Sequence, residues 1–270
     1  MSQPVSAESA TAALAQALGD GGLEIVDLTA PLSSSTPTLE LPDPFNNLID
    51  FSIDNQAEYD DRGPYWKHAN IHTGEHIGTH IDAPIHWISG REGKDVSQVE
   101  PARLIGPALV LDFSAQANEH PDHLIDVADI EAWEAENGAF PQNCWVLVRT
   151  GWDSRAGDRQ SFLNKYDGSS HTPGFTSQCA LWLAERSEIS GVGVETVGID
   201  AGGAAALEPA FPMHYHLLGH DKYGITSLRN LQKLPARGAI IVIAPLPIAG
   251  GTGSPVRVYA LVDGSTGGIQ

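Results

Sequence analysis

Residues 176–199 read TSQCALWLAERSEISGVGVETVGI, a helical pattern that runs directly into a strand-like one. Thr176 is suited to cap the start of a helix, and Gly191 is suited to end it. The segment GVGVETVGI (191–199) is rich in small and β-branched residues, as in a buried strand. A helix followed by a buried strand is the repeating unit of α/β proteins, so this stretch favours an α/β fold.

The rest of the chain continues this alternation. DVADIEAWEAENG (126–138) predicts a second helix, capped by Asp126 and ended by Gly138. Further segments of strand character, bounded by Gly, Pro or Asp, are LEIVDL (23–28), PALVLDF (107–113), CWVLVRT (144–150), AIIVIAPL (239–246) and VRVYALV (256–262). Several are apolar on both faces, as in strands covered by helices on each side. We therefore expect an α/β domain with a mixed sheet flanked by helices.

The first 22 residues are expected to form a separate arm. Residues 6–18 are rich in alanine and predict a helix that ends at Gly19. Its apolar content is modest, which suits an arm that packs on a partner subunit. Because no repeat or low-complexity linker divides the remainder, we expect a single domain over residues 23–270.

Charge and cysteine content exclude several classes of function. The chain has 34 acidic and 15 basic residues, a formal charge of −19, which opposes binding to nucleic acid and to anionic membranes. Its two cysteines, Cys144 and Cys179, lie in apolar segments and exclude a disulfide framework or a CxxC motif. The N-terminus lacks the basic region of a signal peptide, and no apolar run reaches about 18 residues. We expect a cytoplasmic protein that acts on a small molecule.

Residues 76–86, HIGTHIDAPIH, carry the densest group of polar side chains. Five of the 11 histidines fall at even spacing in this region: His68, His72, His76, His80 and His86. In an extended strand they would share one face with Asp82, opposite an apolar face. An amphipathic strand with one wet face explains that pattern without chemistry. Imidazole, glycine and carboxylate are unusual on a wet face, however, and imidazole and carboxylate are preferred ligands of zinc, manganese and iron.

The metal hypothesis requires a bend in the chain. Four residues of strand span roughly 13 Å, whereas two ligands of one ion lie only about 3–4 Å apart. His76 and His80 can therefore share an ion only if the chain turns at Gly78, which permits the bend. We expect a strand to about His76, a bend at Gly78-Thr79 and a turn through Pro84. His86, beyond that turn, is the leading candidate for a proton shuttle.

A second group of histidines lies in MHYHLLGHD (213–221). His216 and His220 would share a face if this segment is helical. His214 and His216 could instead form the H-x-H pair of a cupin-type iron site, which would indicate an oxygenase. At least one of the three is expected to be a polar surface residue.

The motif formed by His76, Gly78, Thr79, His80, Asp82, Pro84 and His86 resembles the HxGTHxDxPxH signature of the cyclase family of metal-dependent hydrolases. That family includes kynurenine formamidase, isatin hydrolase and a trans-dienelactone hydrolase. The resemblance covers most of the chain after residue 22. It implies a swivelling β/α/β fold, a homodimer or homotetramer, and bound Zn²⁺ or Mn²⁺. By position it assigns His76, His80 and Asp82 as metal ligands, His86 as the acid/base and His214 as a later active-site histidine.

The chain also departs from the family pattern. Formamidase-type members place a glutamate for a second metal 12 residues after the position of His214, where this chain has Thr226, so we expect a single ion. Ser227 resembles a serine that orders water and substrate in isatin hydrolase members. The family motif GxDxxSxD is altered to Gly193, Glu195, Gly198 and Asp200, and Glu195 is either a pocket residue or a structural carboxylate.

These features favour a hydrolase that opens a cyclic amide or a lactone with metal-activated water, as isatin hydrolase members do. An arylformamidase acting on N-formylkynurenine is the alternative within the family. A non-catalytic metal-binding protein is the alternative from another class. Aromatic residues that either line the pocket or simply pack are Trp66, Trp87, Phe175 and Phe211.

Overall fold

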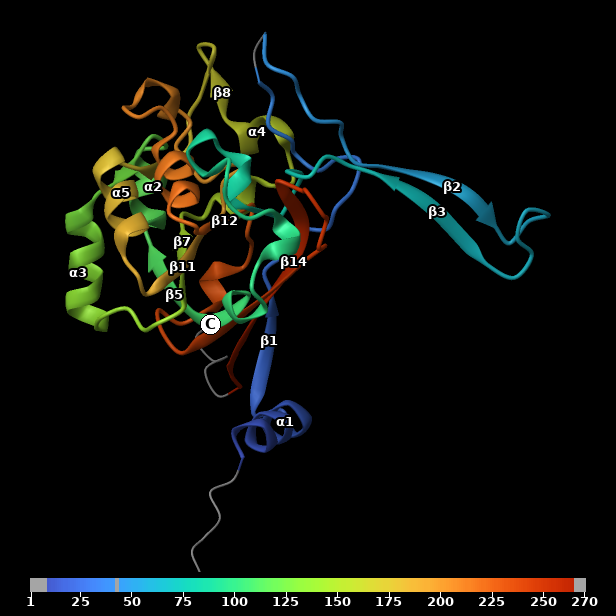
Figure 1. Cartoon of the computed structure of the whole chain (residues 1–270), viewed down its shortest axis with the longest axis horizontal. Helices are drawn as coiled ribbons and strands as arrows, with labels where there is room; N and C mark the ends of the chain where they lie inside the picture. Colours follow the sequence, from blue (N-terminus) through green and yellow to red (C-terminus); the bar gives the residue numbers. More distant parts are fainter. Residues whose placement is uncertain (1–8, 42–43, 265–270) are drawn as a thin grey trace, which may run out of the picture.

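The strand-like segments form one mixed sheet of eight strands in the computed structural model, which describes residues 9–41 and 44–264. The strand order is β1-β14-β13-β5-β7-β11-β12-β4 (Figure 1). Its members are β1 (Leu23–Asp27), β4 (His80–Asp82), β5 (Ile105–Asp112), β7 (Cys144–Arg149), β11 (Ile189–Val194), β12 (Tyr223–Thr226), β13 (Ala239–Pro245) and β14 (Gly253–Asp263). The segment β5-β7-β11-β12 is parallel, whereas the other pairings are antiparallel.

The remaining elements are short. The α-helices are α1 (Ala10–Asp20), α2 (Ser114–Glu119), α3 (Val127–Asn137), α4 (Arg159–Leu163) and α5 (Ser177–Glu185). Small strand pairs are β2 (Ser52–Glu58) with β3 (Lys67–His72), β6 (Leu124–Ile125) with β10 (Gly174–Phe175), and β8 (Lys165–Tyr166) with β9 (Ser169–Ser170). The tight 3₁₀ turns are η1 (Pro84–His86), η2 (Ile88–Gly90), η3 (Val96–Gln98), η4 (Pro101–Arg103), η5 (Trp152–Arg155), η6 (Ala204–Ala206) and η8 (Leu231–Lys233), and η7 (His214–Leu218) is a π-helix.

The sheet closes on itself. The short strand β4 pairs with β12 on one side and with β14 on the other. Seven strands therefore form a ring, and β1 is attached outside it through β14. The sequence predicted a mixed sheet but not this closure, because the closure depends on pairings of a three-residue strand.

Closure of the sheet into a ring also explains why several strands are apolar on both faces. One face contributes to an outer cluster in which Leu109 and Val146 lie with Ile130 of α3 and Leu183 of α5. Alternate residues, such as Val110, point into a second cluster inside the ring. The prediction of helices on each side was therefore wrong, since helices cover the outer face and the other strands of the ring cover the inner one (Figure 1).

The two helices predicted within the α/β domain are present with one change of boundary. Asp126 caps α3, and Gly138 follows it, as expected. Thr176 caps α5 through the backbone N–H of Cys179, but this helix ends at Glu185. Gly191 belongs instead to β11, where a Cβ would lie 2.5 Å from the Trp145 ring. The predicted strand 191–199 correspondingly ends at Val194.

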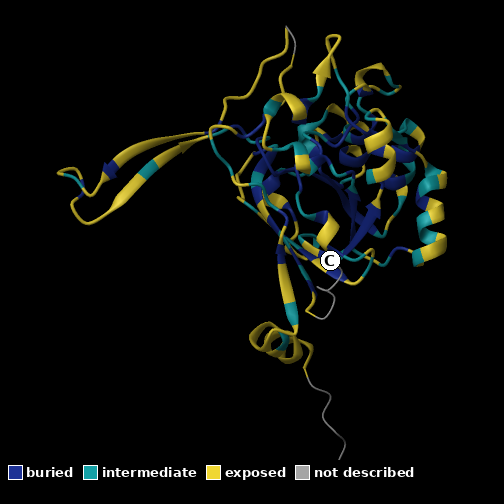
Figure 2. Cartoon of the chain, turned by 180° about the vertical axis from the view of Figure 1, so that it is seen from behind, coloured by how far each residue is buried: buried dark blue, intermediate teal, exposed yellow. Residues whose placement is uncertain are grey.

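The N-terminal part of the chain lies outside the closed sheet. The expected helix 6–18 is observed as Ala10–Asp20, with Gly19 inside it and Gly21 as its left-handed C-cap, and residues 6–8 lie outside the described residues. The hairpin of β2 and β3 projects from the body, and nearly all its residues are exposed (Figures 1 and 2). Among the helices of the described residues, none has the length and apolar character needed to cross a membrane.

Candidate metal centre

The segment between β3 and β4 makes the bend that the histidine spacing requires. Strand β3 ends at His72, not near His76 as predicted. Gly78 has a φ of +64°, a backbone conformation that glycine adopts without strain. The buried side chains of Ile77 and Ile81 anchor the bend on both sides. Pro84 then starts the turn η1, as expected.

The bend brings His76, His80 and Asp82 together. One possible ligand atom from each residue lies within 4.8 Å of the others. The Nδ1 atom of His76 is 2.8 Å from Asp82 Oδ1, and the Nε2 atom of His80 is 3.4 Å from the same oxygen. Two imidazoles and a carboxylate at these separations could hold one divalent ion.

The hydrogen-bonding state of these residues also fits a cation. His80 donates Nδ1–H to the Gly78 carbonyl at 2.9 Å, because a carbonyl can only accept, and this leaves the Nε2 lone pair directed towards Asp82. Asp82 Oδ2 is buried and has no hydrogen-bond partner among the described residues. Burial acts to raise the pKa of the Asp82 carboxyl, but the positive charge that His80 and His76 carry when protonated outweighs burial and holds this pKa well below its usual value.

Two further histidines border the cluster. The His86 ring stacks on His76 with a centroid separation of 3.9 Å, and the His214 ring lies 5.5 Å from His86. Burial is the main reason that the pKa of His86 falls to about 3, which favours its neutral form. The structure therefore brings together all five histidine and aspartate residues predicted for this site.

Asp200 sets the orientation of His214, a role that the sequence did not reveal. Its carboxylate accepts hydrogen bonds from the backbone N–H groups of Met213 and His214 at the start of the π-helix η7. It also lies 2.5 Å from His214 Nδ1, which leaves Nε2 facing Asp82 Oδ2 at 3.9 Å. Burial acts to lower the pKa of His214, but the hydrogen bond to Asp200 and the negative charges of Asp200 and Asp82 together outweigh burial and raise this pKa.

The four predicted pocket aromatics divide into two pairs. Trp87 lies beside the site, with its ring 4.7 Å from His214 and 5.6 Å from Phe211. Trp66 is on the exposed hairpin, where it stacks on His68, and Phe175 is buried in the outer core cluster. Of the four aromatic residues, Trp87 and Phe211 are therefore the two placed to contact a ligand at the cluster of His76, His80 and Asp82.

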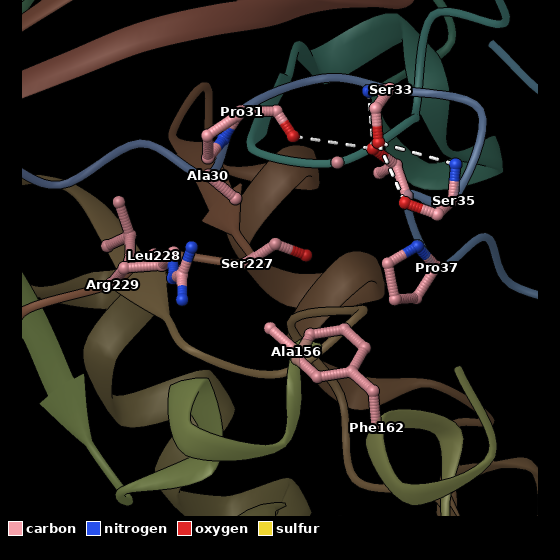
Figure 3. A pocket seen from close by; sticks show the side chains of 12 residues that line it. Ala30, Pro31, Ser33, Ser35, Pro37, Ala156, Phe162, Ser227, Leu228 and Arg229 are labelled. Carbon is pink, nitrogen blue, oxygen red and sulfur yellow. Dashed lines mark hydrogen bonds between the residues drawn. The ribbon is translucent and has the colours of Figure 1, made fainter. Parts of the chain in front are cut away.

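Thr226 and Ser227 lie at the end of β12, beside the bend. The Thr226 hydroxyl is 3.0 Å from His80 Nδ1, so this side chain occupies the space next to the cluster. Ser227 has a positive φ of 53°, and its carbonyl accepts a hydrogen bond from the Thr79 hydroxyl at 2.8 Å. Figure 3 shows the Ser227 hydroxyl directed into a cavity that Gly78 also lines, behind the bend.

The other histidines of the two sequence clusters lie elsewhere. His68 and His72 are in the exposed hairpin, so the alternative of an amphipathic strand with one wet face from His68 to His86 does not hold. His220 is exposed, as expected for at least one residue of its group. His216 is half-buried, and the group of side chains in the described residues with ligand atoms close enough for one ion contains neither His214 nor His216, which does not support a paired iron site.

Comparison with known proteins agrees with this geometry. A family model described as a putative cyclase matches residues 26–201. The chain belongs to the cyclase family. It is 43% identical over 261 residues to isatin hydrolase of Roseibium aggregatum, covering 96% of this chain and 99% of that protein. It is 25% identical over 232 residues to kynurenine formamidase of Bordetella pertussis, covering 86% and 94% of the two chains.

Solved structures of cyclase-family proteins share the fold. Isatin hydrolase A from Ralstonia solanacearum matches with a TM-score of 0.91 and 44% identity, covering 96% of this chain and all of that one. An isatin hydrolase bound to the product analogue thioisatinate matches with a TM-score of 0.91 and 42% identity, covering 95% and 100% of the two chains.

Glu195, in the altered family motif, is a structural carboxylate. It is fully buried, and its Oε2 atom accepts hydrogen bonds from Thr150 N, Thr150 Oγ1 and Trp152 N. Its Oε1 atom has no partner within the part of the chain that the structure describes. Burial raises the pKa of Glu195 from 4.5 to about 7, against the opposing effect of the hydrogen bonds from Thr150.

A Glu195→Gln variant is expected to lose a pH dependence of stability. Between pH 4.5 and 7 the folded wild type holds a proton that the unfolded chain releases, so its free energy of unfolding falls as the pH rises through this window. The full difference is about 3 kcal/mol. Urea unfolding of metal-free wild type and variant from pH 4.5 to 8 measures it. Exposed Glu24→Gln is the control, and parallel curves for wild type and Glu195→Gln would contradict the prediction.

Proposed function

We propose that this chain is a metal-dependent hydrolase that opens the five-membered ring of a cyclic amide of the isatin type. The observation that carries the proposal is the similarity to isatin hydrolases along nearly the whole chain. The cluster of His76, His80 and Asp82 beside His86 supports it, because these side chains supply both a metal site and a proton carrier. Kynurenine formamidases are more distant relatives, so formamide hydrolysis is the secondary candidate.

In this proposal His76, His80 and Asp82 hold one divalent ion, Zn²⁺ or Mn²⁺. The ion, when bound, acidifies water and polarises a carbonyl oxygen. Thr226 supports a single ion, because its hydroxyl stands beside His80 where the formamidase-type pattern has a carboxylate. The preference for zinc or manganese stays a prediction, since imidazole and carboxylate ligands suit both.

His86 is the proposed acid/base residue. A neutral imidazole accepts a proton from the attacking water as the C–O bond forms. The resulting imidazolium then delivers that proton to the amide nitrogen as the C–N bond breaks. His214, held by Asp200, presents its Nε2 atom on the same side and is placed to hydrogen-bond the substrate or the leaving group.

The neighbouring aromatic rings are suited to a flat substrate. Trp87 and Phe211 form an aromatic wall next to His214, and a planar bicyclic amide can stack or pack edge-to-face against such a wall. We assign Ser227 a role in ordering water, since its hydroxyl is directed into the cavity behind Gly78.

We also infer the swivelling β/α/β arrangement and a homodimer or homotetramer. The parallel strands β5, β7 and β11, which are connected through α3 and α5, support the first. Support for assembly comes from the exposed hairpin, where Ile53 and Ile71 are cross-strand neighbours and are both well exposed. An isolated two-stranded hairpin is only marginally stable in water, so contact with another subunit would stabilise it.

The metal-loaded protein is expected to hydrolyse isatin with a kcat/KM roughly 100-fold above that for N-formylkynurenine, because the rings of Trp87 and Phe211 would hold a flat cyclic amide better than an open-chain amide. Steady-state assays with isatin, N-formylkynurenine, a dienelactone and a simple cyclic imide test this. Chelator-treated protein, with and without restored Zn²⁺ or Mn²⁺, is the control. Absence of hydrolysis of all four compounds, with loose binding of several ions, would instead favour a non-catalytic metal-binding protein.

A further inference from the structure

A short hydrogen-bonded chain of side chains leads away from the metal centre through His76. The Nε2 atom of His76 is 2.8 Å from the Thr252 hydroxyl, which lies just before β14. That hydroxyl is 2.5 Å from Glu75 Oε2, and the same carboxylate oxygen accepts the backbone N–H of Thr252 at 3.2 Å. Glu75 and His76 are adjacent in sequence, whereas Thr252 comes from the other end of the chain.

The chemistry of these groups decides where each hydrogen lies. A carboxylate accepts hydrogen bonds but donates none, so the single hydroxyl hydrogen of Thr252 points to Glu75. The Thr252 oxygen then accepts from His76, and Nε2 of His76 must carry a hydrogen. The other ring nitrogen, Nδ1, is 2.8 Å from Asp82 Oδ1. Two acceptors at that separation have to share a proton or a metal ion.

The backbone of residues 251–253 packs against the imidazole ring of His76. A Cβ at Gly253 would lie 2.6 Å from His76 Cε1 and 3.0 Å from its Nδ1. The absence of a side chain at this position therefore allows the edge of the imidazole to pack against β14. Gly253 is also the register partner of Asp82, so the same strand pairing positions the ring and the carboxylate.

We propose that Glu75 and Thr252 are positioning residues that fix His76 in the tautomer whose Nδ1 atom binds the metal ion. The proposal rests on the metal site of the proposed function and adds two residues outside the family signature. Hydrogen-bond partners of this kind raise the basicity of a histidine ligand and prevent its rotation. Their loss typically weakens metal binding by roughly 10–100-fold.

Zn²⁺ affinity of full-length variants, measured by competition with a chromophoric chelator and repeated with Mn²⁺, tests the proposal. Thr252→Val keeps the shape of the side chain but removes the hydroxyl, so its affinity is expected to fall roughly 10–100-fold. Thr252→Ser restores the hydroxyl and is expected to bind within a few-fold of wild type. Glu75→Gln retains an acceptor without the charge and is expected to fall between the two.

Thr38→Val is the matched control. The Thr38 hydroxyl also donates to a carboxylate, Asp50 at 2.6 Å, and this hydrogen bond involves no residue of the metal centre, so its loss should leave the affinity unchanged. Equal affinity of Thr252→Val and wild type, with both folded by circular dichroism, would overturn the positioning role. So would a loss in Thr252→Val that Thr252→Ser does not restore. Absence of binding by wild type would instead overturn the metal site itself.

Discussion

An Asp82→Asn variant is expected to lose its metal ion and at least about 1000-fold in hydrolytic rate. Asparagine keeps the size of the side chain but removes the charge that faces the lone pairs of His76 and His80. The affinity should therefore fall by more than the roughly 100-fold upper range for partners outside the ligand set. Loss of several kcal/mol of metal assistance accounts for the rate. Elemental analysis after gel filtration, together with isatin turnover, measures both effects.

Asp61→Asn, in the exposed tip of the hairpin, provides the matched control and should keep both metal and rate. Thermal unfolding of metal-free Asp82→Asn separates loss of the ion from loss of the fold. An Asp82→Asn protein that retains one ion with wild-type affinity would show that this carboxylate is not a ligand.

A His86→Ala variant is expected to keep its metal ion while kcat falls by roughly 10²–10⁴-fold. This range is typical for removal of a general acid/base. The ion is retained because His86 stacks on His76 without belonging to the ligand group of His76, His80 and Asp82. Single-turnover assays on metal-quantified protein measure the loss. Partial rescue by added imidazole would support a proton-transfer role.

Two companion variants make this result interpretable. His86→Asn fills part of the space beside His76 and should show the same loss in kcat if the effect is chemical. His220→Ala removes an exposed histidine of the second cluster and should retain the wild-type rate. A His86→Ala protein that loses its ion, together with a His86→Asn protein of normal rate, would indicate that His86 only supports the stacking of His76.

The sequence by itself determined the candidate metal cluster, because its parts are local. His76, His80 and Asp82 lie within seven residues, and Gly78 between them allows the bend that the ligand distances demand. Local signals also determined helix α3, where the cap residue Asp126 and the terminating Gly138 act within one turn. These features depend on interactions between near neighbours, which the order of residues makes visible.

Only the tertiary structure decided which distant residues complete the site. Asp200 reaches His214 across 14 positions, and Thr252 reaches His76 across 176, so no spacing rule connects them. Tertiary structure also decided that His68 and His72 do not belong to the site. They share the even spacing but lie in a hairpin outside the ring of strands. Closure of the sheet depends on β4, whose three residues pair with both β12 and β14. Alternation of side chains along the sequence predicts the two faces of a single strand. It does not predict which strands pair, because pairing depends on the packing of the whole chain.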